Sequence, residues 1–255
     1  MAVFAVTIGF MPARIIERSL RAYAATRNGS LAYRHVLVDA HYPIDKERNR
    51  AEIRRVCADL GVEVLDPGRN LGLHGNFNWA LQQLAPTDGD VVIGYDGDSM
   101  PITPGWDMAL VRAILGSRDR QVVWASLMNP RSEVDLLDRG FDRSLADGFI
   151  ELYLTRTAVM NSVCAWSVGW LRSVGYLDEP IKWYGHLESC MWQKLGAKRW
   201  AFLPGWREVD DPRDDHDRAY VVYKWEIAHT RSTTLDFESW LATNPDLGPA
   251  PARLP

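Results

Sequence analysis

The sequence has few cysteines and no long apolar run, and each absence excludes a class of protein. The three cysteines, Cys57, Cys164 and Cys190, are an odd number without CxxC spacing, which excludes a disulfide framework and a cysteine-based zinc site. No apolar segment reaches the roughly 18 residues that a membrane-spanning helix needs, so we expect no membrane span. The apolar segment Ala2–Met11 lacks a basic leader and a small-residue cleavage site, and we interpret it as a buried strand of a cytoplasmic protein.

The chain also lacks an excess of positive charge and the common glycine-rich nucleotide-binding motifs. Its formal net charge is −4, so bulk electrostatic binding to nucleic acid is not expected. Gly68, Gly72 and Gly75 do not follow GxGxxG spacing and no GxxxxGK[ST] segment occurs, which disfavours a Rossmann nicotinamide site and a Walker-type phosphate loop. With 255 residues, 47% of them hydrophobic, the chain is long enough for one large domain.

The sequence does contain a regular alternation of strand-like and helix-like segments. Apolar runs without polar alternation predict buried strands, and apolar residues at helical spacing predict helices between them. The expected order is strand 2–8, a helix from Pro12, strand 33–38, helix 45–60, strand 62–65, helix 76–84, a strand from Val91 and a further strand over 121–126. This order predicts an α/β fold, in which helices flank a central, mostly parallel sheet in a single domain.

Two segments fall outside this alternation. Residues 129–147 are rich in Arg and Asp, and we expect them to form a surface excursion. Residues 244–255 contain four prolines and few large apolar residues, which predicts a loose tail to which we assign no function. The predicted domain therefore spans residues 1–243.

Two carboxylates follow one of the predicted buried strands. The apolar strand from Val91 leads directly into Asp96 and Asp98, which are separated by a single glycine. An Asp-Gly pair after a strand is also typical of a simple turn. An EF-hand calcium loop is excluded, because Pro101 and Asp107 stand where that loop needs glycine and glutamate. Two hard oxygen donors at this spacing can instead hold Mg²⁺ or Mn²⁺ and leave positions open for phosphate oxygens.

Further polar or flexible residues follow the other predicted parallel strands. Gly9, Asp39 and Asp66 each come at the end of such a strand, as Asp96 and Asp98 do. Ligand clefts of open α/β sheets lie beyond the carboxyl ends of the strands. We therefore expect these residues to converge on one ligand site.

At this point the chain resembles a known group, the GT-A-fold glycosyltransferases and in particular the family 2 type. The resemblance covers roughly residues 3 to 230. It is carried by the strand Val3–Gly9, Asp39, the Asn70-Leu71-Gly72 loop that leads to Asn78, the Asp96-Gly97-Asp98 motif and the segment 174–179. The resemblance implies transfer of a sugar from a nucleoside diphosphate sugar, with a UDP-sugar favoured, to an acceptor hydroxyl. The acceptor class stays open between a glycan, a protein, a small molecule and a nucleobase.

The resemblance also implies a donor site in the first half of the chain, residues 1–126, and an acceptor site in residues 127–243. Asp39 is expected to contact the nucleobase and Asn70 and Gly72 to form the nucleotide wall. Asp96 and Asp98 are expected to contact the ribose, the diphosphate and a bound Mn²⁺ or Mg²⁺. The residues assigned to donor binding are Thr7, Gly9, Asp39, Asn70, Gly72, Asn78, Asp96 and Asp98.

An inverting transfer needs a base on the face of the sugar opposite the leaving group. The family usually places an acidic residue at the start of a late helix, and the matching position here is Glu188, with His186 as a second candidate. The alternative interpretation of Glu188 is a carboxylate that stabilises the N-terminus of a helix. Trp183 and Tyr184 precede these residues and are the candidates for stacking on the acceptor, although such aromatics are more often part of a core.

A histidine well after the base often completes the metal site in this fold. Two candidates exist, His216 in an acidic segment and His229 near the end of an apolar run, and His216 is preferred because nearby aspartates supply further oxygens. The alternative is that the segment around His216 is a solvated charged loop.

Two other functions remain open at the level of sequence. A nucleotidyltransferase of sugar phosphates shares a related sheet and also uses metal-bound carboxylates, but it would need a glycine-rich basic loop after the first strand. Gly9 to Arg14 supplies one glycine and one arginine and matches such a loop poorly. A non-catalytic module that binds a nucleotide or glycan would need no base at Glu188.

Overall fold

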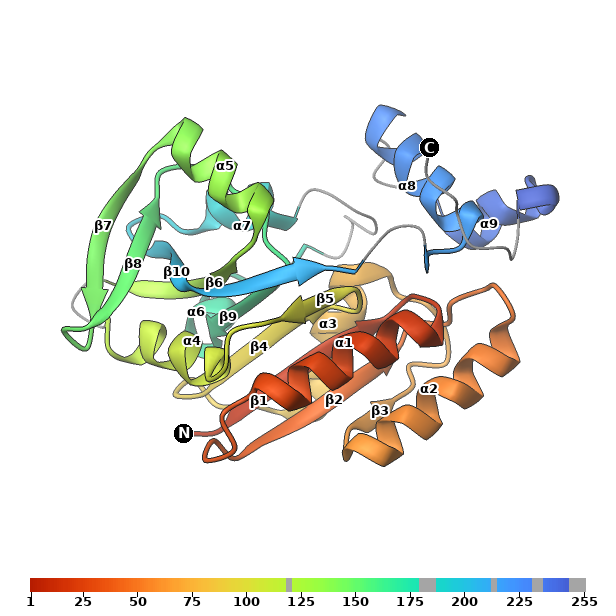
Figure 1. The fold of residues 1–255 in the computed structure, drawn as a ribbon, viewed down its shortest axis with the longest axis horizontal. Helices are drawn as coiled ribbons and strands as arrows, with labels where there is room; N and C mark the ends of the chain where they lie inside the picture. Colours follow the sequence, from red (N-terminus) through yellow and green to blue (C-terminus); the bar gives the residue numbers. More distant parts are fainter. Residues whose placement is uncertain (118–120, 179–186, 212–214, 231–235, 248–255) are drawn as a thin grey trace.

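One mixed sheet runs through the protein (Figure 1). The computed structural model describes residues 1–117, 121–178, 187–211, 215–230 and 236–247. The strands follow the order β3-β2-β1-β4-β9-β6-β10-β8-β7, and β5 pairs with β10. Their bounds are β1 (Val3–Gly9), β2 (Tyr33–Asp39), β3 (Glu63–Leu65), β4 (Val91–Asp96), β5 (Ser99–Pro101), β6 (Val122–Met128), β7 (Phe141–Ala146), β8 (Ile150–Thr155), β9 (Val163–Ser167) and β10 (Arg199–Asp210).

Helices cover both faces of this sheet. On one face the core contains residues of α1 (Ala13–Thr26), α2 (Lys46–Leu60) and α4 (Trp106–Leu115). On the other face it contains residues of α3 (Gly72–Leu84), α6 (Val168–Ser173) and α7 (Leu187–Lys194). The remaining helices are α5 (Pro130–Arg139), α8 (Arg218–Thr230), α9 (Phe237–Ala242) and the short 3₁₀ helix η3 (Pro245–Leu247).

The first half of the sheet is parallel, as the sequence predicts. β3, β2, β1 and β4 pair in parallel, with helices between consecutive strands. Side chains of β1 alternate between the two cores, since Val3 and Ala5 lie in one and Val6 and Ile8 in the other. Burial on both faces explains why these strands are apolar runs rather than alternating sequences. The predicted α/β fold with a central sheet flanked by helices is confirmed.

The second half of the sheet corrects one expectation and adds detail to another. β9 pairs antiparallel with both β4 and β6, and β8 pairs antiparallel with β7 and β10, so the sheet as a whole is mixed rather than mostly parallel. Residues 129–147, expected as a surface excursion, do lie at the surface, but they form α5 and the edge strand β7 of the sheet. Asn129 caps α5 by accepting a 2.8 Å hydrogen bond from the Ser132 N–H, and Pro130 begins the helix. Most side chains of α5 and β7 are exposed, which accounts for their charged composition.

The last helices lie beyond the carboxyl ends of the parallel strands (Figure 1). An aromatic cluster holds them there: the ring centroid of Phe10, just after β1, lies 5.6 Å from that of Tyr42, 6.1 Å from Tyr220 on α8 and 5.9 Å from Phe237 on α9. Tyr42 also donates a 2.7 Å hydrogen bond to Asp217 Oδ2. The chain therefore returns to cover the strand ends after completing the sheet.

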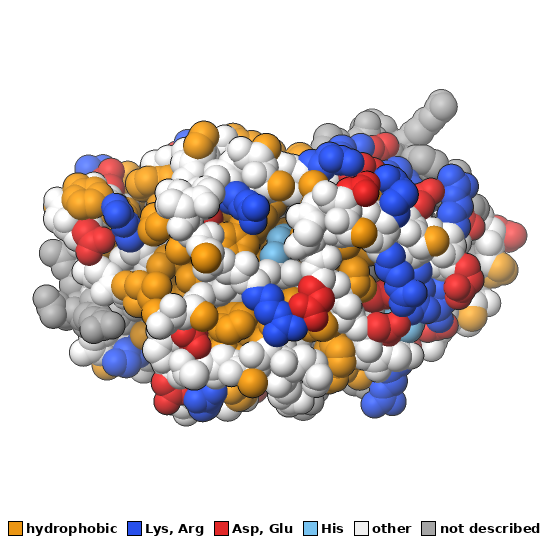
Figure 2. All heavy atoms as spheres, turned by 90° about the horizontal axis from the view of Figure 1, so that it is seen from below, with side chains coloured by type: hydrophobic (Ala, Val, Ile, Leu, Met, Phe, Trp, Pro, Cys, Tyr) orange, Lys and Arg blue, Asp and Glu red, His pale blue; other side chains and the backbone are white. Residues whose placement is uncertain are grey.

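The surface carries charges of both signs. On the face drawn in Figure 2, Lys and Arg side chains lie beside Asp and Glu side chains. Several charged side chains of the protein surface are paired, for example Arg34 with Glu63 at 2.7 Å and Arg55 with Asp59 at 3.2 Å. None of the helices in the described part of the chain is both long enough and apolar enough to cross a membrane.

Candidate active site

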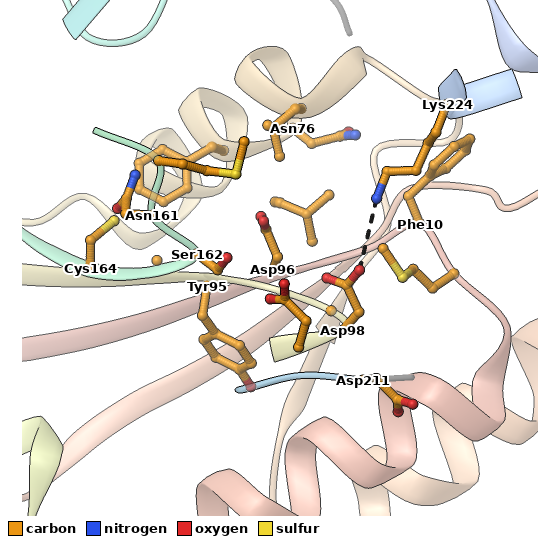
Figure 3. Close-up of a pocket in the computed structure, with 18 of the residues that line it drawn as sticks. Phe10, Asn76, Tyr95, Asp96, Asp98, Asn161, Ser162, Cys164, Asp211 and Lys224 are labelled. Atoms are coloured by element: carbon orange, nitrogen blue, oxygen red, sulfur yellow. Dashed lines mark ion pairs between the residues drawn. The ribbon is translucent and has the colours of Figure 1, made fainter. Parts of the chain in front are cut away.

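A cavity of about 430 Å³ lies at the carboxyl ends of β1 and β4 (Figure 3). Segments far apart in the sequence form its walls: the strand end at Asp96, the start of α3 at Asn76, the residues before β9 at Asn161, α7 at Glu188 and α8 at Lys224. This is the edge of the sheet at which the sequence predicts a ligand site.

Asp96 and Asp98 both line the cavity, as predicted. Burial, and next the negative charge of Asp98, raise the pKa of Asp96 well above its usual range. Gly97 between them lies against β1, where an added Cβ would come within 3.1 Å of the Ile8 carbonyl oxygen. The glycine thus allows the turn to stay close to the sheet, with both carboxylates on the cavity side.

Two potential cations from the C-terminal part of the chain face Asp98. The Nζ atom of Lys224 on α8 lies 3.8 Å from Asp98 Oδ2 (Figure 3), and Nε2 of the buried His216 lies 3.9 Å from the same oxygen. Lys224 Nζ also lies 5.0 Å from the ring centroid of Tyr220. The structure therefore brings His216 next to the acidic pair, whereas the sequence did not point to Lys224.

α7 places Glu188 on another wall of the cavity. Its Oε1 atom faces two donors of Asn161, the backbone N–H at 3.4 Å and the Nδ2 amide at 3.3 Å. The next residue, Ser162, accepts a 3.2 Å hydrogen bond from the Asp96 N–H through its carbonyl oxygen. Adjacent residues thus contact the predicted base and the predicted metal ligand, and the charge of Glu188 contributes to the raised pKa of Asp96.

Asn70 is the further predicted donor-binding residue that lines this cavity. Its Oδ1 atom accepts hydrogen bonds from the Gly72 N–H at 2.9 Å and from Asn76 Nδ2 at 3.1 Å. Gly72 begins α3 with a φ of +78°, a conformation that favours glycine. The two residues thus shape the start of α3, and Gly72 is not among the described residues that line the cavity.

Four other residues assigned to donor binding also lie away from the described lining of the cavity. Thr7 is fully buried and its Oγ1 lies 3.1 Å from Nε2 of His35, a histidine whose pKa burial lowers to about 3. An added Cβ at Gly9 would lie 2.8 Å from Leu37 Cδ2. Asn78 donates to the Leu177 carbonyl oxygen at 2.9 Å and so fixes the segment after α6.

The fourth is Asp39, which is buried and already paired. Its Oδ2 accepts a 2.8 Å hydrogen bond from Arg50 Nε, and its Oδ1 accepts a 3.1 Å bond from the His41 N–H. Its role toward a nucleobase stays a prediction, as do the roles of Thr7, Gly9, Gly72 and Asn78. Trp183, Tyr184 and His186 lie outside the described residues, and so does the side chain of His229.

Sequence reasoning missed several residues that reach the cavity from the second half of the chain. Asn161, Ser162, Asp210 and Lys224 line the cavity, yet no local motif surrounds them. The sequence holds a weak signal for Asn161. The polar pair Asn161-Ser162 directly precedes an apolar strand and so marks the point where that strand begins. Among the described residues, no group of three or more His, Cys, Asp or Glu side chains has the arrangement of a metal site.

Comparison with solved structures shows the fold family. GalNAc-T7 with UDP, GalNAc and Mn²⁺ matches with a TM-score of 0.61 at 14% identity, over 83% of this chain and 44% of that one. The mannosyltransferase PcManGT from Pyrobaculum calidifontis with GDP-Man and Mn²⁺ matches with a TM-score of 0.63 at 18% identity, over 98% of this chain and 65% of that one. S. aureus TarS 1–349 in complex with UDP matches with a TM-score of 0.52 at 14% identity, over 94% and 68%.

This chain thus spans less than two thirds of the length of the first two of these proteins. No protein-family model and no curated protein matches the sequence. The likeness is therefore one of architecture at low sequence identity, and it extends over most of the chain. The protein has the GT-A fold of these glycosyltransferases.

Proposed function

We propose that this protein transfers a sugar from a nucleoside diphosphate sugar, with a UDP-sugar favoured, to an acceptor hydroxyl. The observation that carries the proposal is the pairing of Asp96 and Asp98 on one wall of the cavity with Glu188 on another wall. A carboxylate pair that can hold a cation beside the diphosphate and a carboxylate base are the two elements that such a sugar transfer by displacement needs. The GT-A fold around the cavity supports the same function.

The residues at the end of β4 fit a divalent cation. Asp96 and Asp98 are hard oxygen donors that repel each other, as the raised pKa of Asp96 indicates, and a cation would relieve this repulsion. Asp96 and Asp98 would hold Mn²⁺ or Mg²⁺, with His216 as the predicted third ligand beside Asp98. A cation bound there would offset the negative charge of the diphosphate.

The chain's own side chains would perform the remaining steps. The acceptor oxygen forms a bond to the anomeric carbon, the bond from that carbon to the diphosphate breaks, and its electron pair leaves with the diphosphate. Glu188 accepts the proton of the acceptor hydroxyl. The ammonium of Lys224 lies beside Asp98 and would attract the same diphosphate.

Substitution of Asp96 by asparagine tests the donor site. We expect UDP binding in the presence of Mn²⁺, measured by isothermal titration calorimetry, to weaken by about 10- to 100-fold, because one anionic ligand is lost. We also expect the melting temperature to rise. Because the pKa of Asp96 is raised in the folded protein, ionisation of this carboxyl group destabilises the fold. The stability of the wild-type protein therefore falls as pH rises above about 4, the ordinary pKa of an aspartate. The gain from asparagine is accordingly larger at pH 7.5 than at pH 4.

The matched control is Asp59→Asn, which removes an exposed carboxylate paired with Arg55. It should change neither UDP affinity nor melting temperature by a measurable amount. Absence of UDP binding by the wild-type protein with Mn²⁺, together with absence of GDP binding, would contradict the proposed function. Equal UDP affinity in wild type and Asp96→Asn would contradict the assigned role of Asp96.

Substitution of Lys224 by methionine tests the cationic part of the site. Methionine keeps much of the length of the side chain and removes the charge, so we expect the Kd for UDP to rise by roughly tenfold, the loss of one charge-assisted hydrogen bond. The exposed Lys198 supplies the control, since Lys198→Met makes the same change in net charge away from the cavity. If both variants bind UDP as the wild type does, Lys224 does not contact the diphosphate.

A further inference from the structure

Asn161 stands out among the residues that line the cavity because it contacts the predicted base twice. It precedes β9, is 7% exposed, and directs both its backbone N–H and its side-chain Nδ2 toward Glu188 Oε1, at 3.4 and 3.3 Å. Two donors converging on one carboxylate oxygen favour its ionised form and restrict its rotation.

The orientation of the Asn161 amide is itself fixed by a chain of hydrogen bonds from the core. The indole Nε1 of Trp200 can only donate, and it donates to Ser126 Oγ at 2.9 Å. The Ser126 hydroxyl in turn donates its hydrogen to Asn161 Oδ1, at 3.1 Å. Trp200 and Ser126 are fully buried. The amide oxygen of Asn161 thus faces Ser126, and its NH₂ group faces Glu188.

The neighbouring residue extends this arrangement to the acidic pair. The Ser162 carbonyl oxygen accepts from the Asp96 N–H at 3.2 Å, so the position of Asn161 is set relative to the end of β4. The segment 161–162 thus fixes Glu188 and Asp96 relative to each other. A base must lie within hydrogen-bond reach of the proton that it takes up, so its placement relative to the donor site decides whether transfer occurs.

We propose that Asn161 is a positioning residue. It orients the Glu188 carboxylate so that this group can take up the proton of the acceptor hydroxyl. This proposal rests on the proposed function for its catalytic meaning. The contact between Asn161 and Glu188 can be tested without it. Ser126 and Trp200 act on Glu188 only through Asn161. Substituting them should therefore change the pH dependence of activity in the same direction as substituting Asn161, but by less.

The first test is the pH dependence of sugar transfer or UDP-sugar hydrolysis in Asn161→Asp. This change is nearly isosteric, replaces the NH₂ donor by an oxygen and sets a carboxyl group against Glu188. We expect kcat at pH 7 to fall about tenfold, the acid limb of the pH profile to move to higher pH, and KM for the donor to stay within twofold. Ser126→Ala should move the acid limb in the same direction by less, and the distant Asn244→Asp should leave it in place.

Other titratable groups lie around Glu188 and also contribute to the pH profile. The charge of Glu188 acts on Asp96 on β4, Cys164 on β9 and Cys190 on α7. Asp98, Asp210, His216 and Lys224 line the same cavity. Burial raises the pKa of both thiols, so they stay neutral over the acid limb. Asp96 keeps its side chain in every variant, but Asn161→Asp adds a carboxyl group that titrates with Glu188, so the titration of Glu188 itself is followed in the second test.

The second test needs no activity. The side-chain carboxyl carbon of Glu188 is followed by NMR in protein labelled with ¹³C-glutamate and is assigned by its absence in Glu188→Gln. We expect the Glu188 signal to titrate at higher pH in Asn161→Asp than in the wild type, and Ser126→Ala provides the same comparison if Asn161→Asp does not fold. Identical titration in wild type and variants would overturn the proposal. A shifted titration in a protein that turns over no donor would leave the contact standing and overturn the proposed function instead.

Discussion

Glu188→Gln is expected to lower kcat by about 10²- to 10⁴-fold while UDP affinity stays unchanged. Glutamine keeps the shape of the side chain and still offers an oxygen to the two donors of Asn161. What it cannot do is accept the proton of the acceptor hydroxyl. The substitution therefore separates loss of a base from loss of a binding wall, and the measurement is turnover of a UDP-sugar beside calorimetric titration with UDP.

Glu151 supplies the control, since it is an exposed glutamate on β8 outside the described lining of the cavity. Glu151→Gln should retain full turnover. If Glu188→Gln turns over the donor as fast as the wild type, Glu188 is a helix-start carboxylate and the proton acceptor lies elsewhere. If it loses UDP affinity as well as turnover, Glu188 contributes to the donor site and not to proton transfer alone.

Trp200→Ala is expected to lower the free energy of unfolding by about 3 to 5 kcal/mol. Trp200 is fully buried on β10, and its ring is stacked on that of Trp124, with centroids 3.6 Å apart and an interplanar angle of 1°. Alanine leaves a cavity at this stack and removes the indole donor of Ser126. Urea unfolding followed by tryptophan fluorescence measures the loss, which is large compared with the 5 to 15 kcal/mol typical of whole domains.

Two companion variants make this measurement specific. Trp200→Phe keeps an aromatic ring in the stack but removes the indole N–H, so it should cost less than Trp200→Ala. Trp225 on α8 is 63% exposed, and Trp225→Ala should change the free energy of unfolding by no more than about 0.5 kcal/mol. A cost below about 1 kcal/mol for Trp200→Ala would show that the stack contributes little to the fold.

The first half of the fold could be predicted because its signals are local. The strands β1, β2, β3 and β4 are apolar runs. Pro12 marks the start of α1, and Gly61 marks the end of α2. The helix predicted from Asn76 begins at Gly72 instead, because the Asn70 side chain accepts from the Gly72 N–H and starts the turn earlier. That hydrogen bond depends on a loop conformation that helical spacing does not report.

The second half could not be predicted because its pairing is non-local. β9 lies between β4 and β6 in the sheet, although β5 and α4 separate β4 from β6 along the chain, and α5, β7 and β8 separate β6 from β9. Strand direction follows from such long-range contacts and not from the apolar pattern of Val163–Ser167 itself. The candidate site divides in the same way: Asp96 and Asp98 belong to a local motif, whereas Asn161 and Lys224 reach the cavity only through the topology.

The insertion of β9 beside β4 sets how the cavity can adapt. The two strands are hydrogen-bonded from Val91 opposite Ser167 to Tyr95 opposite Val163, and this ladder ends at the cavity. The strand that carries Asp96 and the segment 161–162 that contacts Glu188 are therefore joined by this ladder. The distance between them cannot change without breaking hydrogen bonds of the sheet. Accommodation of donors or acceptors of different bulk falls to the helical side of the pocket, where α8 is anchored by ring contacts instead of a β-ladder.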